Sequence, residues 1–252
     1  MPTGLEFVDG DSLLVLVLVI AVALVHLLPN RLPVSSGRSR HGLLSAAGGV
    51  SIVYAFLHLF PELDGRRESL EGVDVLVGSL AGHHIYGLAF VGLALFYGLE
   101  RLAAVSRSHE FERDLGPFAD EPVFWIHVGG FAVYNAFIGY VLVRGETGAE
   151  SATLFAVAMA LHLFGNDAAM EQHHRDAYRR IGRWVLAAAV LLGAGVGAVY
   201  TFGDISLTIL LGLLTGGVVF NAIKDELPRT QESRFWAFAA GAVGYGSILL
   251  LL

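Results

Sequence analysis

Residues 160–174 read ALHLFGNDAAMEQHH and place a row of polar side chains inside an apolar run. On a helix, His162, Asn166 and Met170 follow one another at four-residue steps and share one face, which the two terminal histidines continue. Polar groups at membrane depth are costly, so they usually face the interior of a bundle or a water-filled path. We therefore expect this helix to be central, with the rest of the chain built around it.

The composition is that of an integral membrane protein. Of the 252 residues, 55% are hydrophobic and only 15% are charged, which is more apolar than a soluble domain. The absence of cysteine excludes a disulfide framework and a cysteine-ligated zinc site. The net charge of -7 does not describe a nucleic-acid-binding protein. No glycine-rich phosphate loop, Walker motif or nucleophile elbow occurs, so we expect neither a nucleotide partner nor an enzyme.

Eight apolar stretches can each cross a bilayer core, which is about 30 Å thick and takes about 20 helical residues. They are residues 12–29, 41–61, 81–101, 122–144, 151–171, 181–202, 205–224 and 234–252. The first follows an acidic N-terminus without basic residues, so we expect a retained span and not a cleaved signal peptide. Loops are short except for the charged segments 62–80 and 102–121. No linker divides the chain, so residues 1–252 are predicted to form a single all-α domain of eight transmembrane helices.

Basic residues predict the orientation of this bundle. The loops after the first, third, fifth and seventh stretches hold thirteen of the sixteen lysine and arginine residues. The loops on the other side hold only Arg66, Arg67 and Arg144. Both termini are therefore predicted to lie outside the cytoplasm. Fifteen of the sixteen are arginine, which favours a prokaryotic source and a multi-pass protein of the inner (cell) membrane. Glycines within the spans are interpreted as helix-packing positions.

Two spans besides the fifth carry candidate site residues. In 41–61, His58 lies one turn before Glu62; together they could hold a divalent metal or relay a proton, or they could be solvated at the interface. In 122–144, His127 and Asn135 share a face, and the Asn135 amide either serves a site or bonds a neighbouring helix. His26, in the first span, has the same two interpretations.

Asp167 is the decisive residue of the fifth span. About fifteen apolar residues precede it, and an ionised carboxylate buried without a partner costs several kcal/mol. We therefore expect Asp167 to meet a cation, a protonated partner or water. His162 and Asn166 belong to the same functional group, and Glu171 lies between this group and His173-His174 at the inner surface.

Beyond these residues, the chain resembles the ZIP (Zrt/Irt-like) family of divalent-metal transporters. Residues 48–62 are similar to the family's second helix, which ends in His-Leu-x-Pro-Glu, and residues 216–228 are similar to its seventh. The resemblance implies eight spans, both termini outside, and a binuclear metal site between helices four and five. It also makes a homodimer plausible.

The metal motif itself departs from the family pattern. The family's fourth-helix pattern, His-Asn-x-x-acid-Gly, reads Tyr134-Asn135-Ala136-Phe137-Ile138-Gly139 here, and the fifth-helix pattern, His-Glu-x-Pro-His-Glu, reads His162-Leu163-Phe164-Gly165-Asn166-Asp167. Of the two carboxylates that neutralise a metal pair, only Asp167 remains, so we expect one ion and a divergent branch of the family.

These patterns favour a ZIP-like transporter that moves a divalent metal or another small cation through a mid-membrane site by alternating access. Zinc is the first candidate substrate, and iron, manganese or nickel would fit nearly as well. The expected metal ligands are Asn135, His162, Asn166 and Asp167, with His58, Glu62 and Glu171 as further candidates. Besides the ion, the expected partner is the lipid bilayer.

Two alternatives stay open. The first is a transport-inactive ZIP-like protein that acts as an ion sensor or interaction scaffold, which the loss of ligands at Tyr134 and Ile138 favours. The second is a membrane-embedded metal-dependent hydrolase, which needs three ligands and a base close together. His58, His127, His162 and Asp167 could supply them only if helices two, four and five converge.

Overall fold

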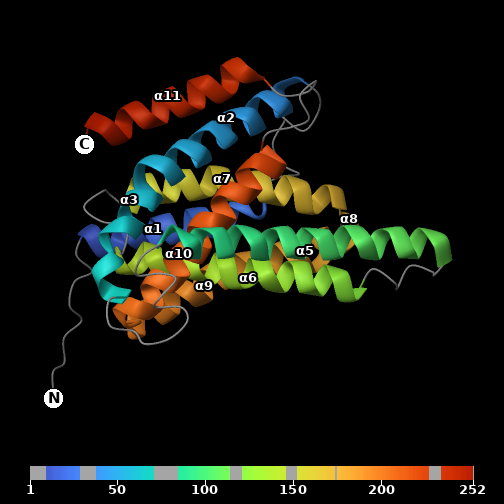
Figure 1. The fold of residues 1–252 in the computed structure, drawn as a ribbon, viewed down its shortest axis with the longest axis horizontal. Coiled ribbons are helices and arrows are strands. Elements are labelled where there is room, and N and C mark those ends of the chain that lie inside the picture. The colour runs from blue at the N-terminus through green and yellow to red at the C-terminus, as the bar shows by residue number, and fades with distance from the viewer. Residues whose placement is uncertain are drawn as a thin grey trace.

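The computed structural model describes residues 10–28, 38–70, 85–113, 121–145, 152–173, 175–226 and 234–251. Within these ranges every regular element is helical, so the predicted all-α class is confirmed there. Each of the eight predicted apolar stretches is helical over most of its described length (Figure 1).

The helices are named in the order in which they follow one another along the chain. They are α1 (Gly10–Val25), α2 (Arg38–Tyr54), η1 (Ala55–Leu59), α3 (Phe60–Gly65), η2 (Arg67–Leu70), α5 (Tyr86–Arg113), α6 (Glu121–Arg144), α7 (Ala152–His173), α8 (Arg175–Ala177), η3 (Tyr178–Gly182), α9 (Arg183–Val199), α10 (Asp204–Asn221), η4 (Ala222–Glu226) and α11 (Phe235–Leu251). η1, η3 and η4 are π-helical turns that run on directly from or into an α-helix, and η2 is a 3-10 turn.

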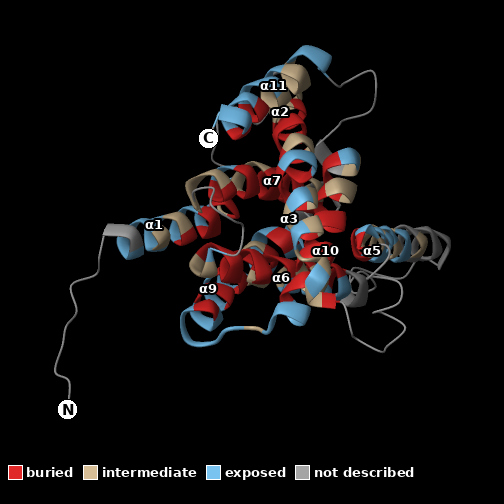
Figure 2. Ribbon diagram, turned by 60° about the vertical axis from the view of Figure 1, so that its left-hand side comes forward, coloured by how far each residue is buried: buried red, intermediate tan, exposed pale blue. Residues whose placement is uncertain are grey.

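Five helical runs in the described ranges are long and apolar enough to cross a membrane. They are Arg40–Gly65, Phe124–Arg144, Ala152–Glu171, Tyr178–Val199 and Asp204–Lys224. Two shorter apolar helices are Ser12–Val25 and Phe235–Leu251. Large apolar side chains such as Leu192 and Trp236 are exposed, as in a surface that meets lipid, and the exposed parts of the ribbon lie on the outward-facing sides of the helices (Figure 2). The chain is therefore a helical membrane protein.

Of the helix ends that differ from those predicted, two have a clear cause in the sequence. α5 continues to Arg113, into the segment expected to be a loop, because no glycine or proline interrupts residues 99–113 and the charged residues there are good helix formers. α1 ends early, at Val25, and Leu27 and Leu28 close a turn on the helix end through backbone hydrogen bonds. The following Pro29 explains this end, because the residue before a proline disfavours helical geometry.

Glycines hold three helix pairs in backbone contact, which agrees with their interpretation as packing positions. A Cβ atom added at these glycines would collide with the partner's backbone: Gly49 with Phe238 and Gly241 with Ala46 (α2–α11), Gly92 with Leu213 and Gly216 with Ala89 (α5–α10), and Gly139 with Val190 and Gly193 with Ala136 (α6–α9). Each pair interlocks in both directions, so it is packed as a unit.

α7 lies at the centre of the bundle, in contact with α1, α2 and α6 (Figure 2). His162, Leu163, Asn166 and Asp167 are all buried. The helix that the sequence predicts to be central is therefore central, and its polar row faces other helices rather than the outer surface.

Candidate functional site

The Asp167 carboxylate is fully buried and contacts one imidazole. Nδ1 of His26 lies 2.9 Å from Oδ1 and 2.9 Å from Oδ2 of Asp167. His26 comes from the turn at the end of α1, and its side chain is also shielded from solvent. The predicted partner of Asp167 is thus an internal side chain from the first span.

The other nitrogen of this imidazole reaches the fourth predicted span. Nε2 of His26 lies 2.9 Å from Oδ1 of Asn135. The amide nitrogen of Asn135 donates to the carbonyl of Phe131, at 2.8 Å, one turn earlier on α6. This bond fixes the orientation of the amide, so its oxygen faces His26 and must accept. Nε2 therefore carries a hydrogen and donates it to Asn135.

A second proton lies in the contact between Nδ1 and the carboxylate. Two acceptors without a hydrogen between them would repel each other at 2.9 Å. Whether the proton sits on the imidazole or on the carboxyl group, the His26–Asp167 pair is electrically neutral as a unit. Neutrality and hydrogen bonding together remove most of the cost of burying the two groups.

A second polar cluster adjoins the first, again between α6 and α7. Nε2 of His162 lies 3.0 Å from the hydroxyl of Tyr134 and 3.2 Å from the amide nitrogen of Asn166. An amide nitrogen only donates, so Nε2 accepts in this contact. The amide oxygen of Asn166 is buried and has no hydrogen-bond partner among the described residues. Its lone pairs are therefore open to a donor or a cation.

The two clusters are supplied by neighbouring residues of the same helices, and together we call them the α1–α6–α7 junction. Its members are His26, Tyr134, Asn135, His162, Asn166 and Asp167. Tyr134 and Asn135 are neighbours on α6, and Asn166 and Asp167 are neighbours on α7, so consecutive residues supply both clusters. Asn135, His162, Asn166 and Asp167, the four principal ligands predicted from the sequence, all lie in this junction.

His58 and Glu62 lie towards the opposite end of α7. Arg40, at the start of α2, reaches the carbonyl of Ala168, whereas Tyr54 packs against Phe155, so the two helices run antiparallel. Phe155 precedes Asp167 by twelve residues, which is about 18 Å along a helix. The His58 ring stacks on Tyr54 and so lies at this distant level.

Glu62 lies one turn beyond His58 and accepts a hydrogen bond from Arg66, at 3.1 Å. The structure therefore separates this predicted pair from the junction. The hydrolase alternative needs helices two, four and five to bring His58 to Asp167, and this arrangement does not do so.

The remaining candidates are placed elsewhere. Glu171 accepts a hydrogen bond from Arg179 at 2.6 Å, one turn past Asp167. His127 belongs to a charged cluster that links α5, α6 and η4. In it, Oε2 of Glu100 lies 3.6 Å from Nε2 of His127 and 2.6 Å from Nζ of Lys224. The side chain of His173 and the whole of His174 lie outside the described residues.

Sequence reasoning did not assign His26 to the site. Its signal was present: a buried carboxylate needs a partner, and His26 is an imidazole at the end of an apolar span. Other spans offered His58, His127 and His162 as equally suitable partners. The choice among them depends on which helices touch, which spacing along the chain does not show.

In the described ranges, no three histidine, aspartate or glutamate side chains stand close enough to hold a metal ion in this conformation. Comparisons of the chain with protein-family models and with curated proteins find no match. The class of the protein therefore follows from its fold and site: a helical membrane protein with a buried polar junction at its centre.

Proposed function

We propose that the protein is a ZIP-like transporter that moves a small cation, a divalent metal such as zinc, through the α1–α6–α7 junction. The observation that carries this proposal is the placement of Asp167. A single carboxylate, fully buried in the central helix, is joined through His26 to the neighbouring fourth span. Attraction between such a carboxylate and a cation is far less screened than in water.

The junction offers suitable ligand atoms for one such ion. Asp167 supplies carboxylate oxygens, Asn135 and Asn166 supply amide oxygens, and His162 supplies an imidazole nitrogen. The Asn166 oxygen has no partner among the described residues, so it can be recruited without breaking a hydrogen bond. Mixed nitrogen and oxygen ligands suit zinc, manganese, iron or nickel.

The packing of the bundle supports alternating access. Three helix pairs interlock through glycines and can move as rigid units: α2–α11, α5–α10 and α6–α9. α1 and α7 lie between these units. In the proposed topology, eight spans place both termini outside the cytoplasm, as the basic residues predict. A site between helix groups that move against one another is the usual arrangement in secondary transporters.

Uptake of zinc into proteoliposomes tests this function. Asp167→Asn keeps the shape of the side chain but removes the charge that attracts the ion, so we expect uptake to fall to the level of empty liposomes. The matched control is Glu171→Gln, four residues along the same helix, which removes a carboxylate bonded to Arg179 and should preserve uptake. Uptake by Asp167→Asn equal to that of the wild type would reject the proposal.

The second candidate is a transport-inactive ion sensor or scaffold with the same fold. The observation that favours it is that Asp167 is already neutralised by the protein's own imidazole. It predicts that the purified protein in liposomes shows no zinc flux above the control, whether or not it binds zinc. A zinc flux that depends on Asp167 excludes this candidate.

A further inference from the structure

We infer that the His26 side chain is an internal occupant of the proposed ion site, and that a divalent cation binds there only by displacing it from Asp167. This inference rests on the proposed function and specifies how the site is regulated. It assigns His26 the role of a displaceable plug, which is distinct from the role of a permanent ligand.

The first support is the position of the imidazole. It faces both oxygens of Asp167 through one nitrogen and the oxygen of Asn135 through the other, at 2.9 Å in each case. These three oxygens are the ones that a cation between α6 and α7 would use. A divalent metal needs such oxygens at about 2.0–2.6 Å. The imidazole and the metal therefore compete for the same lone pairs.

The second support is the element that carries the plug. His26 lies in the turn after α1, where the described backbone bonds run from Leu27 to Leu24 and from Leu28 to Val25. Asn135 and Asp167, in contrast, lie within long helices. Gly139, one turn after Asn135, is packed against the backbone of α9. Of the three groups, the imidazole can move with the least disruption of the backbone.

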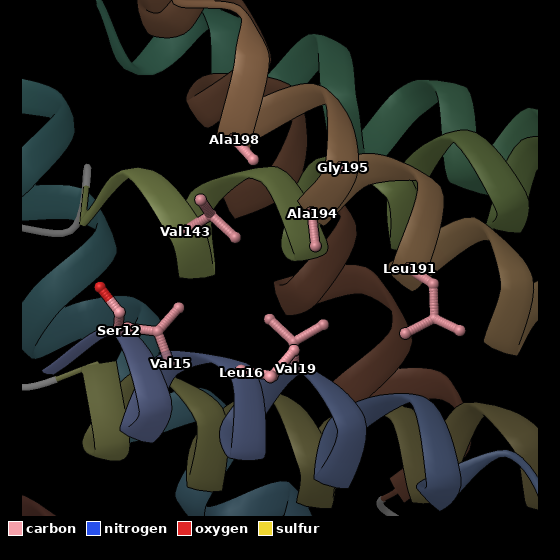
Figure 3. A pocket seen from close by; sticks show the side chains of 9 residues that line it. All are labelled: Ser12, Val15, Leu16, Val19, Val143, Leu191, Ala194, Gly195 and Ala198. Carbon is pink, nitrogen blue, oxygen red and sulfur yellow. The ribbon is translucent and has the colours of Figure 1, made fainter. Parts of the chain in front are cut away.

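The third support is space beside α1. A cavity of about 480 Å³ lies between α1, the end of α6 and α9 (Figure 3). Its lining residues are Ser12, Val15, Leu16 and Val19 from α1, Val143 from α6, and Leu191, Ala194, Gly195 and Ala198 from α9. The three glycine-packed helix pairs are in backbone contact with one another. Beside α1, in contrast, this gap separates it from the facing part of α9. This gap borders residues 12–19, the half of α1 farther from His26, and leaves room for α1 to change its tilt against α9 when His26 leaves Asp167.

A plug of this kind lowers the apparent affinity for the ion. Zinc binds the unplugged conformation, so its apparent dissociation constant is the intrinsic one divided by the fraction of molecules in which His26 is displaced. Removing the imidazole removes this factor. The structure thus predicts that loss of a histidine increases zinc binding, the opposite of what loss of a ligand would do.

Zinc titration of the purified full-length chain, by calorimetry at one fixed pH, tests the inference. The variants are wild type, His26→Ala, Asp167→Asn and the His26→Ala/Asp167→Asn double. We expect His26→Ala to bind one zinc about tenfold more tightly than wild type, or better, and the double variant to lose this gain. His127→Ala, which removes another buried histidine outside the junction, is the control and should bind as wild type does.

Because His26→Ala leaves Asp167 without its imidazole partner, His26→Asn serves as a second variant. Its amide can still donate to the carboxylate but lacks the second ring nitrogen that contacts Asn135, so it is a weaker plug. Thermal unfolding with zinc and with a chelator provides a second readout. Zinc should raise the unfolding temperature of His26→Ala most, that of His26→Asn by a smaller amount because the asparagine keeps one of the two contacts of the plug, and that of wild type least. The reason is that a ligand which binds more tightly stabilises the folded protein more.

The outcomes separate the two proposals. Equal or weaker zinc binding by both His26 variants, with Asp167→Asn weaker still, overturns the plug and leaves the ion site intact. If Asp167→Asn weakens zinc binding neither in the wild-type chain nor in His26→Ala, the proposed ion site is rejected, and the plug with it.

Discussion

Asp167 and His26 are 141 residues apart in the sequence, and their side chains meet without contact with solvent. Neither group would be stable there alone, because an unpaired buried charge costs several kcal/mol. The shared proton makes the pair neutral, and Asn135 accepts the remaining ring hydrogen. At the residue scale, the interior of this protein is therefore arranged around one pair that is satisfied only when both members are present.

A double-mutant cycle on this pair should be strongly non-additive. His26→Ala and Asp167→Ala each leave a buried polar group without its partner, and we expect each to lower the free energy of unfolding by about 3–5 kcal/mol. The double variant leaves neither group behind, so its loss should fall short of the sum by about 0.5–3 kcal/mol. Unfolding measured in the same detergent gives the four values, and additive losses would contradict the geometry described above.

Glycine packing acts at the scale of helices. Two of the three glycines of α9 lie on different faces: Gly193 lies against the carbonyl of Ala136 in α6, whereas a Cβ at Gly195 would meet no atom within 4 Å. The same residue type thus sets the distance between two helices at one position and borders the cavity beside α1 at the other.

This difference predicts opposite effects for two matched substitutions. Gly193→Ala should destabilise the protein by about 1–3 kcal/mol, because the added methyl group forces α6 and α9 apart. Gly195→Ala should be neutral or stabilising by up to about 1 kcal/mol, since alanine favours a helix over glycine. Thermal unfolding of the two variants beside wild type provides the measurement. A similar loss of stability in both variants would show that the α6–α9 contact does not depend on close approach at Gly193.

At the scale of the whole molecule, many large apolar side chains of the described helices are exposed, whereas several polar ones, among them His26, Asn135 and Asp167, are buried. This inside-out distribution suits a protein surrounded by lipid, because helices must satisfy every backbone group internally within the bilayer. The basic residues then decide which side faces the cytoplasm.

Cysteine labelling tests the proposed topology directly, since the chain has no native cysteine. Thr201, in the turn between α9 and α10, and Asp176, in α8, are both exposed and lie at opposite ends of η3–α9. We expect a membrane-impermeant maleimide to label Thr201→Cys in intact cells and Asp176→Cys only after permeabilisation. The reverse pattern would place the termini in the cytoplasm.

The helices were predictable because hydropathy and helix length are local properties. The predicted break between the stretches 181–202 and 205–224 is confirmed by the structure, since α9 ends at Val199 and α10 begins at Asp204. The extension of α5 was missed although the sequence contains its cause, an absence of glycine and proline. Predicting that a charged segment is a loop neglects helices that continue beyond the membrane.

The sequence by itself determined that Asp167 lies in a central helix and needs a partner, because the cost of burying a carboxylate applies wherever the helix packs. Only the tertiary structure decided that the partner is His26 and that His58 belongs to the far end of α7. Which imidazole meets the carboxylate depends on the rotation and neighbours of each helix. Those are set by the sum of many small packing contacts across the bundle, and the spacing of residues along one helix does not contain them.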